Sequence, residues 1–393
     1  MNIQTINLLL FDVISSIGSK IFTFACAFYI LKNTHSPTVY TLYLTIIVLS
    51  TILSQPLFGV YADKYNNKKI VIISQIINVI ALSVFICIFN HYFYYIILLG
   101  VILNLTDGAI SIIVNANIKN ISEKDIERFI SLRQMYTVGI GFLAPILGGI
   151  LIAALKIEYL AFINVITELL AMVFIMAIKI DRVMEVTKNS LKQDFKIGFS
   201  YLLKNKTLLN FMLVAIILNF LINSVVVGVP ITSIQVMKLS SQQFGVIESS
   251  LTIGMFIISL VFSIYPIKNK LKLPFQISII LQFLAVLILS MTLFLNIQNY
   301  LAFVLIGVVY FIIGSALPLS NIPYSIYLQN YIDEQYKGRV FSLNQSIVQS
   351  LTPVSFLVFG ILLNYSQKFI YLIVSILILF VFIYFSTYMK KKI

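Results

Sequence analysis

Long apolar stretches alternate with short polar segments along the whole chain. Most of these stretches can hold a helix of about 20 residues, the length that crosses a hydrocarbon layer roughly 30 Å thick. Because the intervening segments are short, helices that are neighbours in sequence should pack antiparallel. The pattern predicts an all-α membrane protein with twelve transmembrane helices, at residues 8–31, 40–62, 70–89, 92–116, 131–154, 158–180, 206–229, 243–266, 274–296, 299–328, 337–364 and 367–389.

The longest hydrophilic segment, residues 181–205, divides the predicted helices into six and six. We therefore expect residues 1–180 and 206–393 to form two six-helix bundles, joined by a cytoplasmic linker, with a short basic tail after the last helix. An internal repeat supports this division, because the pattern Arg-x-x-Ser-Leu-x-Gln begins at both Arg128 and Arg339, 211 residues apart. Chance similarity between apolar sequences is the alternative. Two such repeats form an architecture in which substrate binds at the repeat interface.

Composition also places the chain in a membrane. Hydrophobic residues make up 60% of it and charged residues 10%, and the mean hydropathy is +1.00, which leaves too little polar surface for a water-soluble protein. The first apolar stretch lacks a basic leader and is too long for a cleaved signal, so we expect it to remain as a span. Cys26 and Cys87 both lie in apolar segments, which predicts neither a disulfide framework nor a metal site. No cofactor is expected.

The net charge of +13 reflects orientation in the membrane rather than a nucleic-acid partner. With the N-terminus inside the cell, about 22 of the 27 Lys and Arg residues lie in cytoplasmic segments, as expected for a membrane protein. Both termini are therefore expected in the cytoplasm of a multi-pass cell-membrane protein. The Ile-, Asn-, Lys- and Tyr-rich composition suggests a bacterial source, and we expect a functional monomer in the lipid bilayer.

A short polar run after the second predicted helix carries a family resemblance. Its characteristic residues are Gly59, Asp63, Lys64, Lys68 and Lys69. The run resembles the G-x-x-x-D-R-x-G-R-R loop of major facilitator superfamily transporters, with Lys in place of Arg and Asn66 in place of the second Gly. The resemblance implies a cytoplasmic gate latch, in which the Asp63 carboxylate caps a helix N-terminus or pairs with a cation in one conformational state. Arg128 and Arg339 supply cations at equivalent helix entrances, and Arg339 is the first partner expected for Asp63. A basic loop without a latch is the alternative.

A second motif lies in the fifth predicted helix. Its glycines and proline are Gly139, Gly141, Pro145, Gly148 and Gly149. They resemble the G-x-x-x-G-P-x-x-G-G motif of exporting members of the superfamily, with Ala144 where the family has Gly. The resemblance implies a tight, kinked helix contact that limits leak in drug/proton antiporters, since small residues let helices approach and Pro bends them. Helix packing with no such role is the alternative.

Segments elsewhere narrow the resemblance to one branch of the superfamily. Ser36-Pro37, residues 195–205 and Gly338–Phe341 are similar to the branch that contains macrolide-efflux and enterobactin-exporter proteins. This resemblance covers most of the chain. The basic residue that many antiporters carry in the fourth helix is missing here, which leaves the proton route open.

Four carboxylates fall inside the predicted spans, namely Asp12, Asp107, Glu168 and Glu248. A charge in hydrocarbon is costly, so each is a candidate for proton coupling. Asp107 is the leading candidate because it shares a helix face with Asn104, Ser111 and Asn115. In the family that the chain resembles, this helix lines the central cavity, where a buried carboxylate can bind and release a proton. A structural carboxylate bonded to neighbouring helices is equally compatible.

For the other charged residues in the spans, position in the helix favours roles other than proton coupling. Asp12 lies near the cytoplasmic end of its helix, which favours a solvated, interfacial role over coupling. Lys20 lies deeper and needs a partner, for which Asp107 is the candidate. Glu168 lies in the middle of the sixth helix, which in the family packs against lipid and other helices. Glu248 lies near the outer end of the eighth helix, which favours a water-facing carboxylate.

Amide side chains in the seventh and tenth predicted helices are candidates for binding a polar substrate, because these helices line the cavity in the family. Amides also hold membrane helices together, which is the alternative. The candidate lining of the substrate cavity comprises Asn104, Asn115, Asn219, Asn223, Asn321 and Lys20.

The sequence thus favours a secondary transporter that exports an amphipathic small molecule, such as an antibiotic or a siderophore, in exchange for protons. It contains no Walker-type ATP-binding loop, so the proton gradient would supply the energy. An importer or uniporter of a small nutrient is the main alternative, which the motif in the fifth helix disfavours. A membrane-embedded enzyme or sensor would need a buried His, Ser or metal cluster, but His35 and His91 both fall in predicted external loops.

Overall fold

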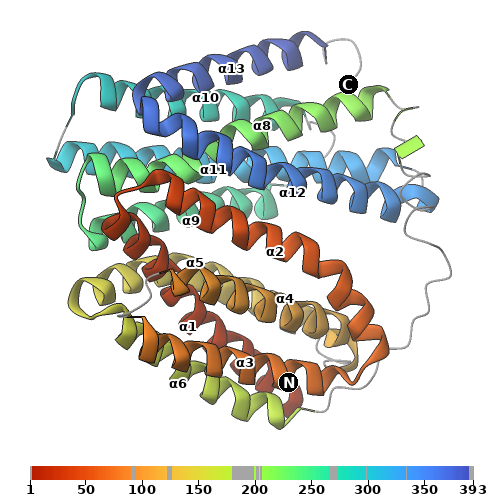
Figure 1. The fold of residues 1–393 in the computed structure, drawn as a ribbon. Coiled ribbons are helices and arrows are strands. Elements are labelled where there is room, and N and C mark those ends of the chain that lie inside the picture. Colours follow the sequence, from red (N-terminus) through yellow and green to blue (C-terminus); the bar gives the residue numbers. More distant parts are fainter. Residues whose placement is uncertain are drawn as a thin grey trace. The chain divides into compact units, whose positions relative to one another are not determined.

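A computed structural model shows a helical chain (Figure 1). It describes residues 2–89, 94–121, 126–178, 199–200, 203, 206–265, 272–297, 299–332 and 334–388. Within these ranges, the description excludes the side chains of residues 55–57, 59–64, 115–116, 118–120, 126–128, 130–131, 134, 207, 299, 328–331, 334–346, 348–349 and 388.

Twelve α-helices occur in the described ranges, and each overlaps one of the predicted spans. The first six are α1 (Ile3–Thr34), α2 (Pro37–Lys64), α3 (Asn67–Ile88), α4 (Tyr95–Ile121), α5 (Ile126–Ala154) and α6 (Ile157–Met176). The other six are α8 (Lys206–Ile231), which a π-helical turn η1 (Thr232–Val236) extends, α9 (Ser241–Ile264), α10 (Lys272–Phe294), α11 (Asn299–Tyr331), α12 (Glu334–Tyr365) and α13 (Gln367–Tyr388). The all-α prediction is confirmed.

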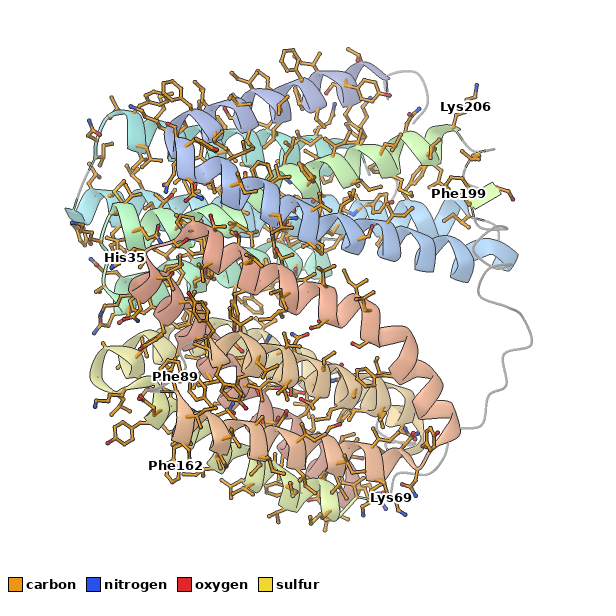
Figure 2. All side chains as sticks on the ribbon, in the orientation of Figure 1. His35, Lys69, Phe89, Phe162, Phe199 and Lys206 are labelled. Atoms are coloured by element: carbon orange, nitrogen blue, oxygen red, sulfur yellow. The ribbon has the colours of Figure 1, made fainter. Side chains whose placement is uncertain are left out.

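Eleven of the described helices are long and apolar enough to cross a membrane. The described part of α12 contributes a shorter apolar segment, Ser350–Tyr365. Large apolar side chains are exposed on the outer sides of many helices; on α6, for example, Val173 is 64% exposed and Phe162 is 54% exposed (Figure 2). Exposed apolar faces of this extent fit contact with lipid rather than with water.

The turn between α2 and α3 accounts for a departure from the family motif. Asn66 has an extended backbone, and its side-chain oxygen accepts a hydrogen bond of 3.0 Å from the backbone N–H of Lys69. An Asn at this position satisfies one of the N–H groups left open at the start of a helix. Asn66, which replaces the family Gly, is therefore the N-cap of α3.

The chain divides into two compact units. The first unit comprises Met1–Thr34, Tyr43–Thr187 and Ser240–Gly245, and the second comprises His35–Leu42, Lys188–Leu239 and Val246–Ile393. The predicted linker, residues 181–205, falls almost entirely outside the described residues, so the predicted domain boundaries stay a prediction.

Helix packing follows the same order within each unit. In the first unit α1 packs against α5 and α6, and α3 packs against α4 and α6. In the second unit α8 packs against α12 and α13, and α10 packs against α11 and α13. In these contacts α8, α10, α11, α12 and α13 take the places of α1, α3, α4, α5 and α6, which is the arrangement expected of an internal repeat.

Candidate functional site

The most enclosed carboxylate in the described part of the first unit is Glu168, in the middle of α6. Its side chain is 0% exposed. Ser15 of α1 donates to the two carboxylate oxygens at 3.1 Å, and Ser19 donates to Oε1 at 3.1 Å. These serines lie about one turn apart and therefore point to the same side of α1. Among the described residues, no cation lies within 4 Å of Glu168, and its hydrogen-bond donors are the neutral hydroxyls of Ser15 and Ser19.

Close contact between α1 and α6 makes this arrangement possible. A Cβ atom added at Gly18 would lie 1.9 Å from Thr167 Oγ1 and 2.6 Å from Asn164 Oδ1. Glycine at this position lets the two helices approach closely. The approach carries Ser15 and Ser19, which flank Gly18 on α1, to the carboxylate of Glu168.

Asp107 of α4 lies near Glu168, and the two charges interact. The side-chain amide of Asn78, in α3, donates to Asp107 at 3.2 Å. Thr106 donates in turn to the carbonyl oxygen of Asn78. The charge of Lys20, in α1, also interacts with that of Asp107. Lys20 and Asp107 thus lie within range of each other's charge but form no ion pair within 4 Å, so their predicted partnership stays a prediction, and Glu168 lies in the same neighbourhood.

Helix α3 contributes two amides, Gln75 and Asn78, that were not among the predicted site residues. Asn78 contacts Asp107, and Gln75, three residues earlier, faces Glu168. The contact of Gln75 lacks hydrogen-bond geometry, and its buried amide atoms have no hydrogen-bond partner among the described residues. Two amides at a spacing of three in an otherwise apolar span were a usable signal, since that spacing places them on one helix face.

We refer to Glu168, Asp107, Lys20, Ser15, Ser19, Gln75 and Asn78 as the carboxylate cluster. Exposure changes across it: Glu168 is enclosed, Asp107 is half-buried, and Lys20 is exposed. A charge is costly in an apolar interior unless it is paired or neutralised. The cluster thus combines an enclosed carboxylate, Glu168, with a more accessible one, Asp107.

Asp12 of α1 forms an ion pair with α5 rather than with the residues of the cluster. Its Oδ2 atom lies 2.8 Å from Nε of Arg133, in α5, and the Tyr136 hydroxyl also donates to it. The side chain of Asp12 is 15% exposed, and that of Arg133 is 23% exposed. The sequence favoured a solvated interfacial Asp12, but the structure instead pairs it across α1 and α5. Arg133 occupies a variable position of the internal repeat and was not predicted as a partner of Asp12.

Breaking this pair should destabilise the protein. We expect Asp12→Asn or Arg133→Gln to cost about 1–3 kcal/mol, between the values for exposed and fully buried pairs. The measurement is a double-mutant cycle on thermal unfolding of the purified protein. The exchanged pair Asp12→Arg with Arg133→Asp should recover part of the loss, whereas additive single effects would show that the pair has no coupling energy.

The predicted amides of the second unit separate into two groups. Asn219 and Asn321 line one cavity, between α8, α10 and α11. Asn223, one turn after Asn219, is 7% exposed and donates to Ser355 of α12 at 2.7 Å. The interpretation as a helix-holding amide therefore fits Asn223.

The remaining polar candidates have other partners. In the first unit, Asn104 accepts a hydrogen bond from Thr51 of α2, while the side chain of Asn115 lies outside the described residues. In the second unit, Glu248 of α9 is half-buried and lies beside the Tyr310 hydroxyl of α11. A fully water-facing Glu248 does not match this contact.

The gate residues are described only in part. The structure does not describe the side chains of four of them, namely Asp63, Lys64, Arg128 and Arg339. The surroundings of Gly59, in α2, are not described either. The predicted pairing of Asp63 with Arg339 therefore stays a prediction.

Two lysines of the signature run lie at the start of α3. Lys68 donates to the backbone oxygen of Met176 at 2.7 Å, at the end of α6, where a cation is favourable because the carbonyl groups there are unpaired. Lys69 is exposed and lies at the edge of the molecule (Figure 2).

Close contacts in the glycine motif of α5 fall in its second half. An added Cβ at Gly148 would lie 2.8 Å from the ring of Phe24 in α1, and one at Gly149 would lie 2.4 Å from the backbone oxygen of Ser241. At Gly139 nothing lies within 4 Å among the described atoms. The structure therefore gives Gly148 and Gly149, but not Gly139, a steric reason to be glycine.

Two units with the same order of helix packing, each built from membrane-spanning helices, form the arrangement typical of membrane transporters with internal repeats. The sequence model of the Major Facilitator Superfamily matches residues 8–356. The chain belongs to this superfamily.

Solved structures of low sequence identity share this fold. The nucleoside transporter NupG has a TM-score of 0.75 at 13% identity, over 98% of this chain and 99% of that one. A bacterial homologue of the iron transporter ferroportin, in its inward-facing state, has a TM-score of 0.73 at 16% identity, over 98% of both chains. A POT family transporter in complex with 5-aminolevulinic acid has a TM-score of 0.77 at 10% identity, over 98% and 96%. A search of curated protein sequences finds no match.

Proposed function

We propose that this protein is a secondary active exporter that exchanges an amphipathic small molecule for protons. The observation that carries the proposal is the environment of Glu168, which is fully enclosed and bonded by neutral hydroxyls. An ionised carboxylate in such a place is unfavourable, and a bound proton removes its charge. Glu168 is therefore suited to carry the proton through the conformational change.

Asp107 supports the proposal as the accessible member of the pair. It is half-buried, its charge interacts with those of Lys20 and Glu168, and Asn78 orients it. Two negative charges in one apolar site repel each other. A proton bound by one carboxylate therefore stabilises the ionised form of the other. Asp107 is thus placed to exchange protons with the outside of the unit, while Glu168 holds one inside it.

Export is the direction favoured by sequence. The glycine–proline motif of α5 resembles that of exporting members, and other segments resemble the macrolide-efflux and enterobactin-exporter branch. The structural neighbours include transporters of nucleosides and iron, so they support the fold and leave the cargo open. We propose a cell-membrane monomer with both termini in the cytoplasm, and a drug or siderophore as cargo.

Transport by purified protein in liposomes tests this proposal. With the lumen about one pH unit more acidic than the medium, one-for-one exchange should accumulate cargo about tenfold inside, since one pH unit is about 1.4 kcal/mol. The compounds to supply are the macrolide erythromycin and the siderophore enterobactin, and accumulation is counted relative to protein-free liposomes with the same gradient, because an amine such as erythromycin is also trapped by protonation in an acidic lumen. Accumulation only when the medium is the acidic side would indicate symport and import, and equilibration without accumulation would indicate a uniporter.

A further inference from the structure

A small cavity in the second unit is unrelated to the carboxylate cluster. Its volume is about 40 Å³, which exceeds the roughly 10–15 Å³ needed for one water molecule. Helices α8, α10 and α11 form it. Its lining comprises Ala215, Leu218, Asn219, Ile222, Phe275, Gln282, Leu317, Ser320, Asn321 and Tyr324.

The lining is polar but carries no fixed charge. Half of these residues are apolar, the others have amide or hydroxyl groups, and none is Asp, Glu, Lys, Arg or His. An ion would enter such a cavity without a counter-charge and would lose its hydration, which is unfavourable. The cavity therefore selects a neutral group that can form hydrogen bonds.

The orientation of the Gln282 amide determines that the cavity offers a hydrogen-bond acceptor. Ser278 donates its single hydroxyl proton to the backbone oxygen of Ala316 at 2.7 Å. The serine oxygen can then only accept from Gln282, and it does so from Nε2 at 3.0 Å. The amide nitrogen of Gln282 is therefore used by Ser278, and the carbonyl oxygen is the polar atom that remains available. Gln282 is 2% exposed, and this oxygen has no hydrogen-bond partner among the described residues.

We propose that this cavity is a binding subsite for a neutral hydrogen-bond donor of the transported molecule, an N–H of an uncharged amide or an O–H of a hydroxyl group. The donor bonds to Oε1 of Gln282, because a buried acceptor left unpaired is unfavourable. Asn219 and Asn321, from α8 and α11, supply further amide groups beside it. The inference rests on the proposed function for its cargo, but not on proton coupling.

Acetamide is a probe small enough for the subsite, and its two relatives isolate the relevant chemistry. Acetone has nearly the same size and keeps the carbonyl but has no N–H, and acetate replaces the amide by a charge. We expect acetamide, and neither relative, to raise the thermal unfolding temperature of the purified protein in a saturable manner, without any gradient or cargo. Equal shifts from acetamide and acetone, or no shift at all, would overturn the inference and leave a cavity that holds water only.

Variants locate the effect. Gln282→Met keeps the length of the side chain but removes the acceptor, and should weaken acetamide binding about tenfold. Asn219→Ala, a second lining variant, should also weaken it, so the inference stays testable if one protein fails to fold. Asn223→Ala is the matched control, because this amide lies one turn away on α8 and is bonded to Ser355. An acetamide shift that persists in both lining variants would contradict the proposed subsite.

The outcomes of the two proposals can be told apart. Acetamide binding that depends on Gln282, together with cargo transport that ignores the pH gradient, would retain the subsite and reject proton exchange. Proton-driven transport without specific acetamide binding would retain proton exchange and reject the subsite.

Discussion

Glu168→Gln is expected to abolish proton-driven accumulation of cargo while leaving exchange of cargo across the membrane intact. Glutamine has nearly the same shape and its carbonyl oxygen can still accept from Ser15 and Ser19, but it cannot take up a proton. With about one pH unit across liposomes, the accumulation ratio should fall from about tenfold to unity. Exchange of labelled for unlabelled cargo, which needs no net proton movement, should continue.

A matched control exists on the same helix. Glu158 lies in the first turn of α6, and Glu158→Gln makes the same chemical change away from the carboxylate cluster, so accumulation should stay at the wild-type level. Infrared difference spectra offer a readout without cargo, in which a carboxyl band that responds to pH should disappear in Glu168→Gln. Unchanged accumulation by Glu168→Gln would remove this residue from the coupling path and leave Asp107→Asn as the next variant to test.

Hydropathy was sufficient to predict the helices. The spans predicted at 274–296 and 367–389 correspond to α10 (Lys272–Phe294) and α13 (Gln367–Tyr388) within a few residues. Bilayer thickness sets the length of each apolar stretch, and this length is visible in the sequence. The ends of α1 were predicted less well, since the helix covers Ile3–Thr34 rather than residues 8–31. A helix can continue past the hydrocarbon layer, and hydropathy does not mark where it ends there.

The carboxylate cluster was predictable only in part, for a physical reason. Charged residues in apolar spans are conspicuous, so Asp107, Lys20 and Glu168 could be selected individually. Which of them meet depends on the rotation of each helix about its axis. A helix such as α6 is apolar on nearly every side, so its sequence does not fix that rotation. Lipid and protein are similar environments for its side chains, and only packing contacts decide which side faces inward.

The two units differ in chemistry despite their shared order of packing. In the first unit the enclosed Glu168 lies near the half-buried Asp107, whereas the second unit has the half-buried Glu248 and a separate cavity lined by neutral groups such as Asn219 and Gln282. A repeat fixes the backbone arrangement but leaves each position free to change its side chain. Division of labour follows as an expectation: ion coupling in the first unit and recognition of a neutral cargo group in the second.

Gly18→Ala is expected to destabilise the protein by about 1–3 kcal/mol, the range for inserting a methyl group into a packed interface. The new Cβ would lie 1.9 Å from Thr167 Oγ1, so α1 and α6 must move apart. Gly139→Ala is the control, since nothing lies within 4 Å of its Cβ in the described structure, and it should be neutral or stabilising because alanine is the better helix former. Thermal unfolding of both purified variants measures the difference.

Separation of α1 from α6 should also impair coupling, because Ser15 and Ser19 would lose their 3.1 Å contacts with Glu168. Loss of stability and loss of coupling should therefore appear together in Gly18→Ala. Thr167→Ala added to Gly18→Ala removes the hydroxyl that the new methyl group meets first, and should restore part of both properties. If Gly18→Ala lowers stability but exchanges protons for cargo as well as wild type, the serines are not needed at Glu168, and the enclosed carboxylate works without its hydroxyl partners.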